Sequence, residues 1–162
     1  MTAPLKNTLV LGVGNTILRD DGVGIYVVRR VESLLAEHGD EGIEVAEAEL
    51  AGFALIDLLD RYRSAIIVDA VKIPGREPGE IQLLDIDSFR ATSHLVTGHE
   101  IDLPTAVELG RKIGRCLPEV IDIIGIQAAD DRSLSEECTP NVQQAIEPAA
   151  RLALERARKR AR

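Results

Sequence analysis

Three segments of this chain hold acidic, amide and imidazole side chains that could bind a metal ion or transfer a proton. In chain order, the candidates are Asn15, Asp20, Asp21, Asp69, His94, His99 and Glu100. If two carboxylates and one imidazole converge, they form a mixed oxygen and nitrogen site, a ligand set that suits borderline divalent ions such as nickel and zinc. Two monodentate carboxylates and one imidazole also leave coordination positions open, as in a site that binds substrate or water.

The strands that would position these residues are indicated by apolar runs. Stretches at 8–13, 65–69 and 120–126 predict buried strands, and stretches at 43–50 and 80–86 predict two more, the last of them at an edge. Because these runs alternate with helical patterns, we expect a three-layer α/β/α sandwich with a mostly parallel, about five-stranded twisted sheet. In such folds the working residues follow the carboxyl ends of the strands, which would bring the candidate segments to one edge.

Four helices are expected to cover this sheet. Their predicted positions are 22–35, 53–62, from Leu103-Pro104 onward, and from Thr139 onward with Pro140 at the first helical position. Pro148 predicts a kink in the last helix, and residues 88–102 are expected to form a polar loop that carries the histidines. No repeat or linker divides the sequence, so residues 1–162 are expected to form one domain.

Composition and charge exclude several classes of partner. Aromatic residues make up 2% of the chain, which removes the stacking platforms of a single-strand nucleic-acid binder. Residues 151–162 hold six bases and one acid, a pattern that we interpret as the solvated end of a helix. No run is long enough for a membrane span, no secretory leader is recognised, and Cys116 and Cys138 match no metal or redox spacing. We therefore expect a cytoplasmic protein without nucleic-acid or membrane partners.

Each candidate residue also has a structural interpretation. Asp20 or Asp21 could cap the first helix, and the doubled acid allows one to cap while the other acts. Asp69 could be a strand-end turn residue, although an ionised carboxylate beside so apolar a strand is costly without a partner. His99 could hydrogen-bond within its own loop, and His94 has the weaker functional pattern because Leu and Val follow it.

The glycine-rich turn at residues 12–17 suggests a second function, a nucleotide- or small-ligand-binding module. This turn lacks the third glycine of the dinucleotide fingerprint, because Ile17 stands in its place. Asp20 and Asp21 would also place negative charge close to the position of a pyrophosphate. The turn is therefore a degenerate version of that motif, and the binding module is kept as the alternative function.

A set of segments in fixed order gives the most specific indication of function. They are residues 9–15, 20–24, 66–70, Gly98-His99 with Leu103, 124–127, and Leu134, Thr139-Pro140 and 142–148. In this order they resemble the hydrogenase maturation endopeptidases, and the resemblance covers about residues 8–155. These enzymes trim a short C-terminal extension from the precursor of the large subunit of nickel–iron hydrogenase.

The resemblance implies a ligand set for nickel: Asp21, Asp69 and His99. It also implies that the nickel is supplied by the precursor, that no organic cofactor is needed, and that the protein acts as a monomer or weak oligomer. Some members of the family carry Glu at the position of Asp21. The roles of Glu100 and Asp102 stay open, because the family varies between its loop histidine and the next helix.

The chemical step is left open between two routes. Asp21 or Asp69 could act as general base on a water if its pKa is raised by burial or by its neighbour. Alternatively, the nickel could polarise the scissile carbonyl. The sequence shows no serine nucleophile elbow, no recognisable Cys–His pair and no His-Glu-x-x-His helix. A partner that docks the precursor without cutting it is a third possible function.

Overall fold

A five-stranded sheet forms the centre of the computed structural model, which describes residues 6–49, 52–93 and 102–162. The strands are β1 (Lys6–Val13), β2 (Ile43–Ala48), β3 (Tyr62–Val71), β4 (Ile81–Leu84) and β5 (Val120–Gln127). Their order in the sheet is β2-β1-β3-β5-β4, and β4 pairs antiparallel with β5 at one edge while the other pairs are parallel. The predicted mostly parallel sheet with an edge strand after residue 80 is confirmed.

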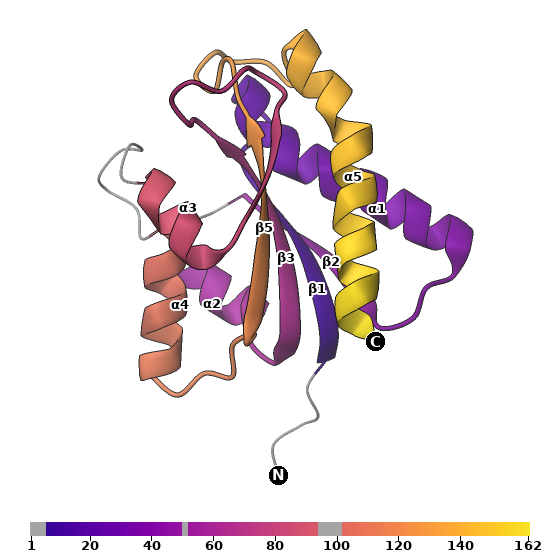
Figure 1. Cartoon of the computed structure of the whole chain (residues 1–162), viewed down its shortest axis with the longest axis vertical. Coiled ribbons are helices and arrows are strands. Elements are labelled where there is room, and N and C mark those ends of the chain that lie inside the picture. The colour runs from indigo at the N-terminus through magenta and orange to yellow at the C-terminus, as the bar shows by residue number, and fades with distance from the viewer. Residues whose placement is uncertain (1–5, 50–51, 94–101) are drawn as a thin grey trace.

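Helices cover both faces of this sheet (Figure 1). They are α1 (Val23–His38), α2 (Phe53–Leu59), α3 (Ile86–Ser93), α4 (Leu103–Lys112) and α5 (Pro140–Ala161), with a short 3-10 helix, η1 (Arg19–Gly22), before α1. Helices α1 and α5 pack together on one face, and α2, α3 and α4 lie on the other. The predicted three-layer sandwich is confirmed. No helix in the described parts of the chain is long and apolar enough to cross a membrane.

Each face of the sheet has its own aliphatic core, because alternate side chains of a strand point to opposite faces. Ile66 and Val68 of β3 pack into the cluster beneath α1 and α5, whereas Ala65 and Ile67 belong to the cluster beneath α2 and α4. The central strands are buried on both sides, which is why they read as continuous apolar runs in the sequence.

Two glycines bring the start of α1 into direct contact with the backbone of the sheet. A Cβ atom added at Gly12 would lie 2.4 Å from the carbonyl oxygen of Gly24, and one added at Gly24 would lie 2.3 Å from the carbonyl oxygen of Val68. A larger residue at either position would push the helix away from β1 and β3. The close contact fixes η1, which directly precedes α1, near the carboxyl ends of these strands.

The predicted polar loop at 88–102 is wrong in its first part, where α3 extends to Ser93. The carboxylate of Asp85 accepts a hydrogen bond of 2.7 Å from the backbone N–H of Ser88, and Phe89 is buried in the core beneath this helix. A capping side chain and one buried aromatic therefore start a helix in a polar stretch. His94, His99 and Glu100 lie outside the described residues.

The basic C-terminal segment forms the end of a helix with exposed bases, as predicted, but some of its bases also bind carboxylates of the rest of the protein. Arg156 and Arg160 both donate to the carboxylate of Asp122, whose side chain is 11% exposed, with ion-pair distances of 3.1 and 3.2 Å. Arg158 pairs with Asp40 at 2.6 Å. These contacts dock the end of α5 against β5 and the loop after α1. Helix α5 also continues through Pro148 as one element.

Candidate active site

Asp21 and Asp69 lie at the same edge of the sheet although 48 positions separate them in the sequence. Asp69 stands near the end of β3, and Asp21 belongs to η1. Burial, followed by the nearby negative charge of Asp21, raises the pKa of Asp69 to about 8, against a smaller opposing effect of the Ala70 N–H. The two carboxylates are therefore close enough for one charge to affect the other, where solvent stabilises their charges poorly.

A closed turn holds Asp21 in this position. The backbone N–H of Asn15 donates to the Asp21 side chain at 3.1 Å, and the Asp21 N–H donates to the carbonyl of Leu18 at 3.0 Å. Gly14 has φ 153, and a Cβ atom there would lie 2.0 Å from the Asp21 carbonyl oxygen. The glycine therefore allows the turn to close against η1.

Asp20 has a different role from its neighbour. It is fully buried, and its carboxylate accepts hydrogen bonds from the N–H groups of Ala129, Asp130 and Thr139 at 2.9, 2.9 and 2.7 Å. The Thr139 hydroxyl also donates to it, at 2.8 Å. Asp20 thereby ties the loop after β5 and the start of α5 to the turn that carries Asp21.

The capping interpretation of the doubled acid is wrong in detail. The N-cap residue of α1 is Gly22, so neither Asp20 nor Asp21 caps this helix. Thr139 is the N-cap residue of α5, as predicted, but its hydroxyl bonds to Asp20 instead of to the helix. The alternative in which one acid caps while the other acts is therefore wrong in its first half, and the chemical role of Asp21 stays a prediction.

Asp102, whose role the sequence left open, has a structural role. It is the N-cap residue of α4, and its carboxylate accepts a hydrogen bond of 2.8 Å from the Thr105 N–H. Within the described ranges, no three His, Cys, Asp or Glu side chains lie close enough to hold a metal ion. The third predicted ligand, His99, is outside those ranges.

Backbone N–H groups of the turn after β1 are hydrogen-bonded within the protein and do not point at a phosphate site. In a dinucleotide site, the N–H groups after the first strand point at the pyrophosphate. Here the N–H of Asn15 is bonded to the Asp21 carboxylate. The close packing that a third glycine would permit at position 17 is supplied by Gly24. These observations disfavour the nucleotide-binding alternative.

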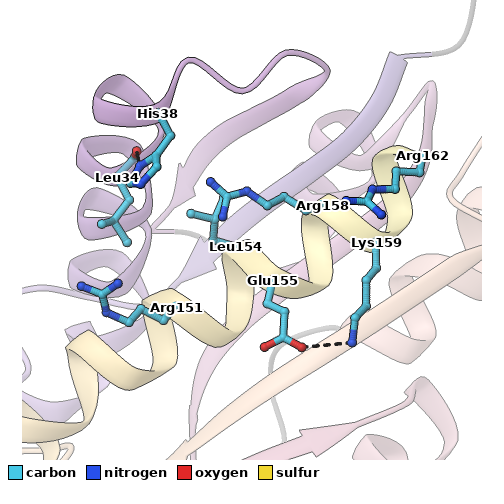
Figure 2. Close-up of a pocket in the computed structure, with 8 residues that line it drawn as sticks. All are labelled: Leu34, His38, Arg151, Leu154, Glu155, Arg158, Lys159 and Arg162. Carbon is cyan, nitrogen blue, oxygen red and sulfur yellow. Dashed lines mark hydrogen bonds and ion pairs between the residues drawn. The ribbon is translucent and has the colours of Figure 1, made fainter.

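A separate pocket of about 330 Å³ lies between the C-terminal parts of α1 and α5 (Figure 2). Its lining includes Leu34, His38, Arg158, Lys159 and Arg162. Lys159 points toward Glu155, with which it forms an ion pair of 3.0 Å. Since α1 has 16 residues, its far end lies roughly 20 Å from the end near Asp21. This pocket is therefore remote from the carboxylate pair.

Comparisons with known proteins agree on one family. Residues 26–156 match the family model described as hydrogenase maturation protease. A Methanocaldococcus jannaschii relative named for the same family is 31% identical over 152 residues, which cover 88% of this chain and 93% of the relative. The hydrogenase 2 maturation protease of Escherichia coli is 26% identical over 144 residues, covering 87% of this chain and 84% of that protein.

A solved structure extends this similarity to the fold. The hydrogenase maturating endopeptidase HybD from E. coli superposes with a TM-score of 0.73 at 26% identity, covering 94% of this chain and 93% of HybD. The family resemblance expected from the sequence and the predicted endopeptidase activity are confirmed.

Proposed function

Because the chain belongs to the hydrogenase maturation protease family, we propose that it removes a C-terminal extension from the nickel-loaded precursor of the large subunit of nickel–iron hydrogenase. In this proposal Asp21, Asp69 and His99 bind the nickel ion that the precursor carries. The observation that supports it most is the pair of carboxylates at the carboxyl edge of the sheet. Their proximity is unfavourable in the free protein, and a divalent cation would make it favourable.

The raised pKa of Asp69 gives this pair a preference for a metal ion held by the substrate. With a pKa of about 8, Asp69 holds its proton at neutral pH in the free protein. A cation must displace this proton before it can bind both carboxylates. A free ion is then bound weakly, whereas an ion brought by a docked precursor benefits from the other contacts of that protein. The site would thus favour the nickel-loaded precursor over the empty one.

Two routes to hydrolysis are compatible with these residues. In the first, Asp21, or Asp69 after it has lost its own proton, accepts a proton from the water that attacks the scissile carbonyl. In the second, the substrate's nickel polarises that carbonyl. In both, the contacts that hold the precursor convert a slow encounter into a reaction within one complex.

Mass analysis of the large subunit tests this function. The precursor is prepared with and without nickel and incubated with the protein. We expect the nickel-loaded form to lose its C-terminal extension and the nickel-free form to stay intact. Asp69→Asn should abolish the loss, whereas Asp57→Asn, a change at an exposed α2 carboxylate, should not. Equal cleavage of both precursor forms, or of neither, would contradict the proposal.

The cellular setting belongs to the same proposal. Cys116 and Cys138 are free thiols, which is compatible with a reducing compartment. We therefore place the reaction in the cytoplasm, with the protein acting as a monomer or weak oligomer on the precursor.

A further inference from the structure

Two exposed aliphatic side chains lie on the turn that carries Asp21 and on the loop that is hydrogen-bonded to this turn. Leu134 is 80% exposed and Ile17 is 52% exposed. The carbonyl of Ile17 accepts a hydrogen bond from the N–H of Ser135, the residue after Leu134. Single exposed apolar residues are common on protein surfaces and need no explanation. These two differ because the fold brings them together from segments that are more than 100 positions apart.

A short parallel bridge joins the two segments. Leu18 pairs with Ser135, the Ser135 N–H donates to the carbonyl of Ile17 at 3.0 Å, and the Arg19 N–H donates to the carbonyl of Ser135 at 2.9 Å. Ile17 and Leu134 each precede a paired residue, so they are opposite one another across the bridge. Figure 1 shows the loop after β5 beside the start of α1, at the end of the sheet where β3 terminates.

The buried carboxylate of Asp20 makes this surface rigid. Its bonds to the N–H groups of Ala129, Asp130 and Thr139 hold both ends of the loop that carries Leu134. The same turn carries Asp21. The loop is therefore held in a fixed position relative to the carboxylate pair, and the entropy cost of ordering it has already been met before any partner binds.

We propose that Ile17 and Leu134 form a docking surface for an apolar segment of the hydrogenase large-subunit precursor. This inference rests on the proposed function, because it takes the precursor as the protein that is cut beside Asp21 and Asp69. Because Ile17 lies on the turn that carries Asp21, a polypeptide that is cut at these carboxylates comes within reach of this surface. Arg132 and Glu136, which flank Leu134 closely in the chain, are exposed, so charged groups lie around an apolar centre as in many protein interfaces.

The test separates binding from cleavage. Binding to immobilised nickel-free precursor, which is expected to stay uncut, is measured for the wild type, Leu134→Ser and Ile17→Ser. Burial of an exposed leucine on binding corresponds to about a tenfold change in dissociation constant. We expect each variant to bind about tenfold more weakly and to show a similarly raised KM for the nickel-loaded precursor, with kcat unchanged.

Matched variants control for folding and for general loss of apolar surface. Leu134→Met retains the apolar area and should restore wild-type binding. Ile113→Ser removes a side chain of similar exposure, 61%, next to the end of α4, and should change neither constant. Thermal melting should be the same for all variants, since the replaced side chains are largely in solvent.

Several results would overturn the docking surface while leaving the protease assignment in place. One is that the wild type cleaves the precursor and Leu134→Ser does so with an unchanged KM. The others are that the wild type cleaves but does not bind the nickel-free precursor, or that the main effect of the variants is a shift from dimer to monomer. If the wild type binds the precursor without cutting it, the proposed function fails, and the dissociation constants still decide whether this surface is used. If it neither binds nor cuts the precursor, both proposals fail.

Discussion

Asp20 and Asp21 are neighbours in the chain, but their carboxylates are in opposite situations. The Asp20 carboxylate accepts hydrogen bonds from three backbone N–H groups and one hydroxyl. The Asp21 carboxylate accepts a hydrogen bond from the Asn15 N–H, and its negative charge helps to raise the pKa of Asp69. Buried charge is tolerated when donors compensate it and is costly when they do not. Asp20 therefore stabilises the fold, whereas ionisation of the buried Asp69 carboxyl beside Asp21 costs stability.

The largest expected effect is on catalysis at the Asp21–Asp69 pair. Asp69→Asn or Asp21→Asn should lower the rate of precursor cleavage by about 10³-fold or more, because each removes a candidate metal ligand and base. His99→Ala should have a similar effect. The measurement is the initial rate of large-subunit shortening at saturating precursor, with circular dichroism to show that the fold is retained. Wild-type rates in these variants would mean that the site lies elsewhere.

The compensated carboxylate should behave in the opposite way. Asp20→Ala leaves the N–H groups of Ala129, Asp130 and Thr139 without their acceptor and frees the loop after β5. We expect the free energy of unfolding to fall by about 3 kcal/mol, measured by urea denaturation. Asp21→Asn should change it by less than about 1 kcal/mol. Equal losses in the two variants would remove the distinction between the neighbouring acids.

A third effect concerns the ion pairs at the end of α5. The double variant Arg156→Ala with Arg160→Ala leaves the largely buried Asp122 carboxylate without its two cations. We expect a loss of about 2 kcal/mol in unfolding free energy, with cleavage per folded molecule unchanged. Replacing Asp122 by Asn in this background should recover part of the loss. If the double variant is as stable as the wild type, these ion pairs do not stabilise the helix end.

The sequence predicted the fold better than it predicted the side-chain contacts of Asp20, Asp122 and Asp40. Apolar runs predict β1, β3 and β5 because strands that are buried on both faces carry apolar side chains along their whole length. The meeting of Asp21 and Asp69 follows from the rule that carboxyl ends of parallel strands share one edge. The contact between Asp20 and Thr139 spans 119 positions and has no periodic pattern, so no local signal reveals it. The same holds for the arginines that bind Asp122 and Asp40.

The smallest expected effect is a dependence of stability on pH. The pKa of Asp69 is about 8 in the folded protein and near the ordinary value of 3.8 in the unfolded chain. Between these values the unfolded chain releases a proton that the folded protein keeps, so this group lowers stability as the pH rises. Asp69→Asn removes the effect. Because the residue keeps part of its surface exposed, we expect a gain of about 1 kcal/mol at pH 8, shrinking toward pH 4.

Thermal or urea unfolding of the wild type and Asp69→Asn across this pH range measures that gain. Asp57→Asn, at an exposed carboxylate of α2, provides a control whose stability difference should not depend on pH in the same way. A difference that grows toward acidic pH would contradict the unfavourable environment inferred for Asp69.

Anomalous diffraction at the nickel edge, from crystals of the complex with the uncut nickel-loaded precursor, shows whether the two carboxylates and the imidazole share one ion. We expect a peak about 2.1 Å from an oxygen of Asp21, an oxygen of Asp69 and a ring nitrogen of His99. A peak at other residues, or none while both carboxylates remain without a metal, would contradict this expectation.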